Sequence, residues 1–156
     1  MDRRALNETR ALLSKADAVY RPYSCPASAE CCRLKDTGRQ PWLWPSEWAL
    51  LMEHLKREGR TLPPKRDDGA CPFLVGERCG VYGARPFGCR TYFCHRAAGP
   101  KRQPLEETNA LLERFAALHA EGGEPKALLD WYDGDGSSSA APSSGASRHL
   151  LPGEKE

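Results

Sequence analysis

Seven cysteines are the residues of this sequence whose type and spacing best suit chemistry, and they fall into two blocks. The blocks are separated by 38 residues and consist of Cys25, Cys31 and Cys32, then Cys71, Cys79, Cys89 and Cys94. Thiolates are strong ligands for zinc and for the iron of iron–sulfur clusters. Neither block alone supplies four well-separated ligands, so a four-thiolate site requires both blocks to meet in the folded chain. The sequence therefore predicts a metal centre that joins the start of a domain to its middle.

The same cysteines could instead form disulfides, but two features of the sequence argue against this. Their number is odd, and residues 1–13 contain no continuous apolar stretch of signal-peptide length. No window approaches the length of a transmembrane span either. We therefore expect a cytoplasmic protein without membrane association, in which the thiols stay reduced and can bind a metal.

The spacing of the cysteines, C-x5-C-C followed by C-x7-C-x9-C-x4-C, leaves the number of metal sites open. It matches neither the paired C-x2-C motifs of a zinc ribbon nor the C-x2-C-x2-C run of a bacterial ferredoxin. One four-thiolate site would leave three cysteines over. These could form a second zinc site with a histidine, for which His95 beside Cys94 is the best candidate. Alternatively, a single cluster could keep one iron open to a substrate.

Arginines close to the cysteines are candidates for a supporting role around the metal. Four thiolates around Zn²⁺ or a [4Fe–4S]²⁺ core carry a net charge of about −2, which guanidinium groups can offset by hydrogen bonds to sulfur. Arg85 and Arg90 bracket Cys89 and are predicted to act in this way, although both could be ordinary surface arginines. Basic residues elsewhere form short isolated pairs and the net charge is only +2, so we expect no nucleic-acid partner.

The elements that must position these residues are mainly helical. Apolar residues at helical spacing predict helices over 3–20 and about 46–58, with Ser46 as the cap of the second, and a third that starts near Pro104. A short helix is expected within 125–131, and residues 73–82 should form a β-hairpin. The aromatic segment 41–45 could be a ligand-stacking platform, but we favour large rings that cover a thin core and shield the metal site.

We therefore predict a small single domain, mainly α, with irregular metal-stapled loops and one short hairpin. The domain should span residues 1–132, and 133–156 should be a disordered tail because it is rich in Gly, Ser, Ala and Pro. Leu, Val and Phe provide only 25 of the 156 residues, and there is no Ile. Burial of so few large apolar side chains offsets little chain entropy, so a metal staple should help to hold the fold.

The motifs in order resemble the YkgJ-type cysteine-cluster family. A Cys-Cys pair is followed by Cys71-Pro-Phe-Leu, by Cys79-x-Val-Tyr, and by Arg85-Pro-x-x-Cys89-Arg90. The resemblance covers about residues 25–94. Proteins of that family are described as carrying a zinc- or iron-chelating domain, which also occurs in flagellin lysine N-methylases.

The resemblance implies metal binding by six cysteines, whereas Cys94 is added only because it lies near them. The six are Cys25, Cys31, Cys32, Cys71, Cys79 and Cys89. Many relatives have a further thiol in the first block where this chain has Ser28, so the ligand count of that block is open.

Several functions fit this pattern. We favour an iron–sulfur cluster over zinc, because of the methylase relatives and because the spacing does not suit a zinc ribbon. An iron–sulfur-dependent enzyme resembling the protein-lysine N-methylases is one alternative. No Gly-rich loop opens a helix after a strand, so S-adenosylmethionine would have to bind on the cluster itself. A structural zinc module that presents a surface to a protein partner is another, and a metal-delivery protein with exchangeable thiolates is a third.

Overall fold

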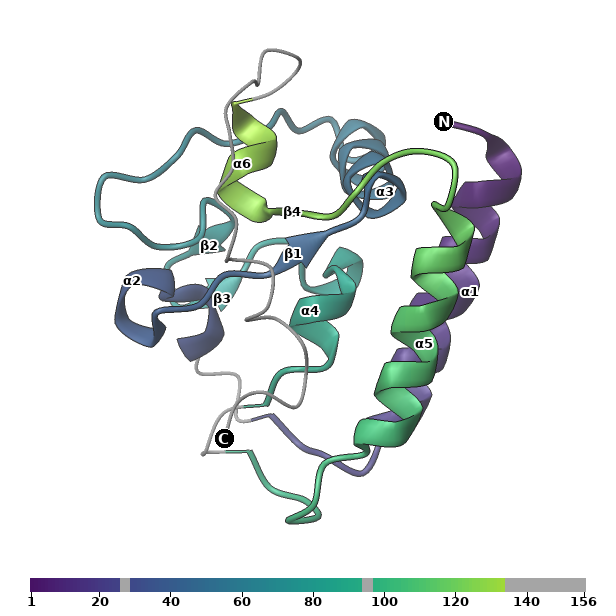
Figure 1. The fold of residues 1–156 in the computed structure, drawn as a ribbon. Coiled ribbons are helices and arrows are strands. Elements are labelled where there is room, and N and C mark those ends of the chain that lie inside the picture. The colour runs from purple at the N-terminus through teal and green to yellow at the C-terminus, as the bar shows by residue number, and fades with distance from the viewer. Residues whose placement is uncertain (26–28, 94–96, 134–156) are drawn as a thin grey trace.

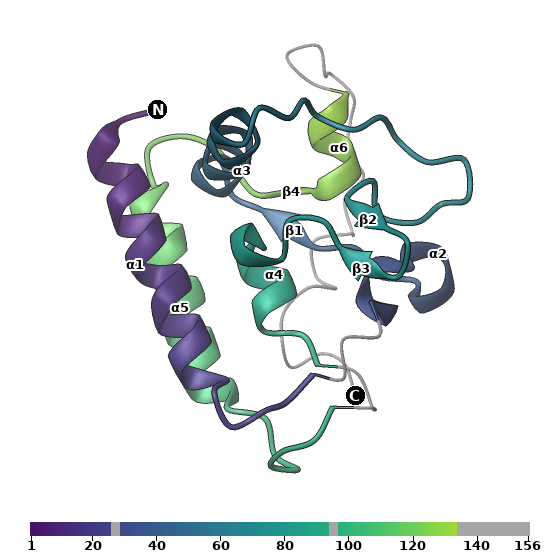
Figure 2. The same cartoon turned by 180° about the vertical axis from the view of Figure 1, so that it is seen from behind.

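Two antiparallel helices, α1 and α5, form one side of the molecule in this computed structural model (Figures 1 and 2). Helix α1 spans Arg3–Val19 and α5 spans Leu105–Leu118. A hydrogen bond of 2.9 Å between the hydroxyls of Tyr20 and Thr108 joins the end of α1 to the start of α5. The structure describes residues 1–25, 29–93 and 97–133, and the statements below concern these ranges.

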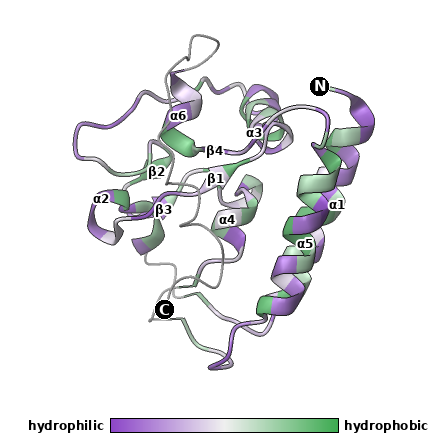
Figure 3. Ribbon diagram, in the orientation of Figure 1, coloured by the Kyte–Doolittle hydropathy of each residue, from purple (hydrophilic) through white to green (hydrophobic). Residues whose placement is uncertain are grey.

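Both helices form because apolar residues recur at helical spacing, as the sequence predicted. In α1, Leu12, Leu13 and Ala16 are buried on one face, and the Asp2 carboxylate caps the helix by accepting the Arg4 N–H. In α5 the buried side chains include Leu111 and Phe115. Figure 3 shows apolar and polar residues alternating around both helices, as expected for helices with one buried face.

Helix α3, Pro45–Arg57, crosses beside α1 and is fastened to it by a buried polar contact. The Thr9 hydroxyl donates to the Ser46 hydroxyl at 2.6 Å, and both residues are fully buried. The prediction that Ser46 caps this helix is therefore wrong. The cap is Trp44, whose N–H donates to Oε2 of Glu47 at 3.0 Å, because the helix begins at Pro45 and Ser46 already lies inside its first turn.

The remaining elements are short. Two two-stranded antiparallel sheets pair β1 with β4 and β2 with β3. Their bounds are β1 Trp42–Leu43, β2 Leu74–Val75, β3 Arg78–Cys79 and β4 Lys126–Ala127. Short helical elements are η1 Glu30–Cys32, α2 Leu34–Thr37, η2 Tyr82–Ala84, α4 Phe87–Arg90 and α6 Leu128–Tyr132. The β2–β3 pair is the predicted hairpin, whereas the β1–β4 pair joins segments more than 80 residues apart and was not predicted.

Two groups of buried side chains form the core. One lies between α1, α4 and α5 and includes Leu12, Phe87 and Phe115. The other lies on the opposite side of α3 and combines Leu43, Leu51 and Phe73 with two cysteines. These two are Cys32 and Cys71, and Cys31 and Cys79 pack against them, so each cysteine block contributes to the second core.

The prediction of a mainly α fold with a short hairpin is confirmed. The predicted helix within 125–131 is present as α6, shifted to Leu128–Tyr132. Residues 134–156, which make up nearly all of the predicted disordered tail, lie outside the described residues. In the part of the chain that the structure describes, no helix is both long and apolar enough to cross a membrane.

Candidate metal centre and the adjoining cavity

The thiol of Cys32 lies at the centre of a group of cysteine side chains from both blocks. It interacts with the thiols of Cys31, Cys71 and Cys79, and these hydrogen bonds raise the pKa of Cys32. The same interaction lowers the pKa of Cys71, that of Cys31 to about 7 and that of Cys79 to about 6. The four thiols thus form one interacting group, in which a proton held by one thiol favours the thiolate forms of its neighbours.

Backbone geometry brings the two blocks together. Element η1 carries Cys31 and Cys32, and it begins after Ala29, which adopts a left-handed conformation with φ of 57°. The N–H of Cys71 donates to the carbonyl of Cys32 at 2.7 Å, which fixes the first residue of the second block against the last residue of the first. The β2–β3 hairpin then returns the chain so that Cys79 pairs with Leu74, three residues after Cys71.

Cys89 faces this group from helix α4. Burial is the main reason that the pKa of its thiol is raised well above the ordinary value, and the charges of Cys71, Cys31 and Cys79 act in the same direction. The buried carboxylate of Glu47 holds α4 in place, because its Oε1 accepts the N–H of Phe87, the first residue of that helix, at 2.6 Å. Glu47 therefore joins the start of α3 to the start of the helix that carries a predicted ligand.

The other predicted ligands are placed differently. Cys25 is exposed and directly precedes residues 26–28, which lie outside the described residues together with Ser28. Cys94 and His95 also lie outside the described residues. Across residues 1–25, 29–93 and 97–133, Cys, His, Asp and Glu side chains form no group of three or more that could hold a metal ion as they stand. The thiols of Cys31, Cys32, Cys71, Cys79 and Cys89 thus lie near one another, but they are not arranged as the ligands of one metal ion.

The two predicted supporting arginines have different charged partners. Arg85 lies over the ring of Tyr82, 3.9 Å from its centroid, and its charge contributes to lowering the pKa of both Cys31 and Cys79. Arg90 is largely buried and donates to the Asp17 carboxylate at 2.6 Å and to the Arg85 carbonyl at 2.6 Å. Its side chain is therefore used to fasten α4 to α1.

Arg60 is a cation near the thiols that the sequence did not indicate. It follows helix α3, where the N–H of Arg60 donates to the Leu55 carbonyl at 2.8 Å and that of Gly59 to the Lys56 carbonyl at 3.0 Å. This pair of bonds is a Schellman motif, which requires the left-handed φ of 67° that Gly59 adopts. The turn directs the Arg60 guanidinium to the Gly80 carbonyl at 3.0 Å, where its charge also lowers the pKa of Cys79.

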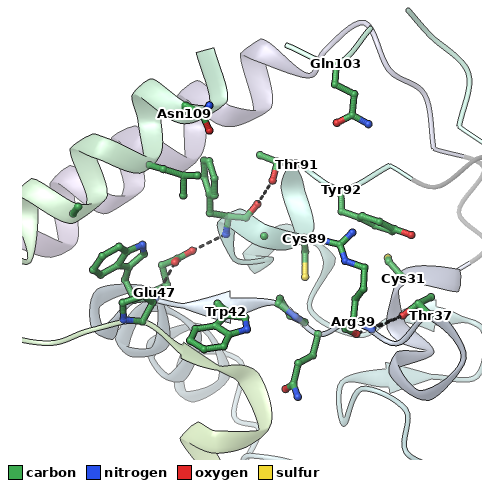
Figure 4. A pocket seen from close by; sticks show the side chains of 18 of the residues that line it. Cys31, Thr37, Arg39, Trp42, Glu47, Cys89, Thr91, Tyr92, Gln103 and Asn109 are labelled. Atoms are coloured by element: carbon green, nitrogen blue, oxygen red, sulfur yellow. Dashed lines mark hydrogen bonds between the residues drawn. The ribbon is translucent and has the colours of Figure 1, made fainter. Parts of the chain in front are cut away.

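A cavity of about 560 Å³ adjoins the cysteine group (Figure 4). Cys31 and Cys89 form part of its wall. The aromatic residues Trp42 and Trp44, from the segment predicted to cover the core, line it as well. Trp44 also stacks on Phe115, with ring centroids 6.3 Å apart, so the segment serves both as core cover and as cavity wall.

No protein-family model, no curated protein and no solved structure matches this chain. The resemblance of its motifs to the YkgJ-type family therefore stays a prediction from the sequence. Any account of function has to be built from the cysteine group, the arginines beside it and the adjoining cavity.

Proposed function

We propose that this chain binds a metal between its two cysteine blocks, in the form of an iron–sulfur cluster, with zinc as the second candidate. The observation that carries this proposal is the convergence of Cys31 and Cys32 with Cys71 and Cys79, across 38 intervening residues, around the thiol of Cys32. Thiols that only fill a core have no need to gather in this way, since an isolated buried cysteine packs as a small apolar side chain.

The chemistry of the donor set fits a soft metal. Thiolate is the ligand that iron–sulfur clusters and structural zinc prefer, and metal binding requires the thiols to lose their protons. Arg85 and Arg60 lie where their charges favour the thiolate forms of Cys31 and Cys79. Cys31, Cys32, Cys71 and Cys79 are thus the proposed ligands, and Cys89, Cys25 and Cys94 are candidates for further ones.

A metal would change the way in which the thiols interact. The thiols are neighbours, and a metal would draw them together and neutralise their mutual repulsion. We favour iron–sulfur over zinc because the ligand spacing is unlike a zinc ribbon and because the motifs resemble a family with methylase relatives. A reducing compartment such as the cytoplasm would keep these thiols available.

A structural zinc site is supported by one specific observation, the burial of Cys32 and Cys71 among the side chains of the second core. Structural zinc sites are closed and contribute folding energy without chemistry. An experiment is therefore needed to decide between an iron–sulfur cluster and zinc.

The test is anaerobic purification of the full chain, followed by a visible absorption spectrum and by quantification of iron, acid-labile sulfide and zinc. The proposal predicts a brown protein with iron and sulfide in near-equal amounts. A colourless protein with one zinc per chain would replace the iron–sulfur assignment by zinc. Absence of both metals at stoichiometric level, in protein that is folded by circular dichroism, would contradict metal binding altogether.

A further inference from the structure

The cavity beside the cysteine group has the composition of a ligand site. Its walls are mostly apolar and come from η1 and α2, the segment around β1, helix α4 and the residues after it, helix α5 and the residues before it, and the turn before β4. The aromatic residues Trp42, Trp44 and Tyr92 line the space, together with Leu112 and Ala116 of α5. At about 560 Å³ the cavity falls in the size range of sites that bind small molecules.

One cationic side chain reaches this cavity among the described lining residues. The Arg39 guanidinium lies over the Tyr92 ring, 4.6 Å from its centroid, and Figure 4 shows it extending alongside Cys89. Within the described part of the chain it makes no ion pair with a carboxylate, unlike Arg90 and Arg66, which both pair with aspartates. A guanidinium held against an aromatic ring at the edge of an apolar cavity is suited to bind a carboxylate, sulfonate or phosphate.

Three other polar groups on the wall do not compete with Arg39 for an anion. Both oxygens of Glu47 accept backbone N–H groups, from Trp44 and Phe87. The Gln40 side-chain oxygen accepts the Leu129 N–H at 2.9 Å. Glu113 is exposed on α5 and, as a carboxylate, would repel an anion. Arg39 is the one cationic group among the described lining residues, so an anionic group is favoured at Arg39, with the apolar body of the ligand beside the tryptophans and α5.

We propose that this cavity binds a small, flat, apolar molecule that carries one anionic group, with the anion on Arg39 and the body against Trp42 and Trp44. Since Cys31 and Cys89 belong to the same wall, such a ligand would lie next to the cysteine group. The proposal goes beyond metal binding and does not depend on which metal is bound.

Two matched fluorescent probes test the proposal on the full chain at constant metal content. 1-Anilinonaphthalene-8-sulfonate has the flat apolar body and an anionic group, and N-phenyl-1-naphthylamine has the same body without the charge. We expect Arg39→Gln to weaken binding of the sulfonate about tenfold and to change binding of the neutral probe less than about twofold, because only the charge-assisted contact is lost. Arg57→Gln, at an exposed arginine outside the cavity wall, is the matched control and should change neither.

A second variant, Ala116→Trp, fills the cavity from the exposed surface of α5 and should weaken both probes about tenfold or more. The proposal is overturned if Arg39→Gln binds the sulfonate as tightly as Arg57→Gln does, or if it weakens both probes equally. It is also overturned if a folded Ala116→Trp variant binds both probes as the wild type does, since they would then bind elsewhere. If Ala116→Trp does not fold, the comparison of the two probes on Arg39→Gln still tests the proposal.

Discussion

A single buried carboxylate, that of Glu47, organises the region between the two cores. Its two oxygens accept N–H groups from the starts of two helices, Trp44 at α3 and Phe87 at α4. Burial nevertheless raises the pKa of Glu47 to about 7, against the effect of these hydrogen bonds and of the nearby Arg90 charge. The group that positions Cys89 therefore titrates within the range of ordinary buffers.

This titration predicts a pH dependence of stability. Because the folded-state pKa of Glu47 lies above its unfolded value of 4.5, the unfolded chain releases the proton first. The free energy of unfolding should therefore fall as pH rises from about 4.5 to 7, by an amount on the order of 3 kcal/mol from this group. Denaturant unfolding of the metal-free protein at pH 5 and pH 7.5 measures the change.

Glu47→Gln is the control for this prediction, since an amide does not titrate in this range. The variant should be less stable than the wild type at pH 5, because its NH₂ group would face a backbone N–H from which a Glu47 oxygen accepts a hydrogen bond. Its stability should also change less than that of the wild type between pH 5 and pH 7.5. Equal pH dependence in wild type and variant would show that Glu47 is not the group responsible.

Single residues also show where reasoning from the sequence succeeds and where it cannot. Arg85 lies four residues before Cys89 and Arg90 directly after it, yet it is the more distant Arg85 whose charge acts on the thiols, whereas Arg90 pairs with Asp17. Nearness in sequence does not determine the partner of a side chain, because Arg90 lies on α4 whereas Arg85 precedes that helix in an extended conformation. Arg60 reaches the thiols from 19 residues before Cys79, and no local motif indicates such an approach.

At the scale of elements, the turn after α3 is the feature with the sharpest energetic consequence. Gly59→Ala should destabilise the protein by about 1–2 kcal/mol, because its φ of 67° is costly for any residue with a Cβ. Thermal or denaturant unfolding measures this loss. A steric clash of the new side chain is not the cause of this loss, since a Cβ at position 59 would meet no other atom within 4 Å.

The matched control for that turn is Gly122→Ala. Gly122 also has open space around a Cβ, but its φ does not lie in the left-handed region. It should therefore change stability by no more than a few tenths of a kcal/mol, or raise it slightly. If both variants lose the same stability, the Schellman motif does not account for the cost at Gly59.

Elements with a repeating pattern could be predicted from the sequence, and pairings between distant segments could not. Helices α1, α3 and α5 each span three or more turns, enough for apolar spacing to reveal them. Strands β1 and β4 have two residues each, too few for an alternating pattern to be detected. Their pairing depends on tertiary contacts, such as the hydrogen bond from the Trp131 indole to the Leu43 carbonyl.

At the scale of the whole molecule, the candidate site and the fold depend on each other. The sequence predicts a metal site shared by the two cysteine blocks, and the structure places Cys31 and Cys32 of the first block beside Cys71 and Cys79 of the second. The sequence could not indicate the cavity, since its walls come from residues between 31 and 125 that only the fold brings together. The second core contains Cys32 and Cys71, so a metal there would stabilise the same contacts that the apolar side chains make.

Removal of the metal should therefore lower the stability of the whole chain. A ligand that binds only the folded state and is present at about a thousand times its dissociation constant adds about 4 kcal/mol to the free energy of unfolding. We expect a strong chelator to lower the melting temperature by many degrees, as followed by circular dichroism. An unchanged melting curve, after metal analysis has shown complete removal, would contradict the role of the metal as a staple.

The convergence of the two blocks is tested most directly by the metal content of two single variants, Cys32→Ser from the first block and Cys71→Ser from the second. Val75→Ser, at an exposed position of the β2–β3 hairpin, is the control. We predict that each cysteine variant loses most of its bound metal while the control retains it, because one centre draws ligands from both blocks. Full metal content in either folded cysteine variant would contradict a shared centre.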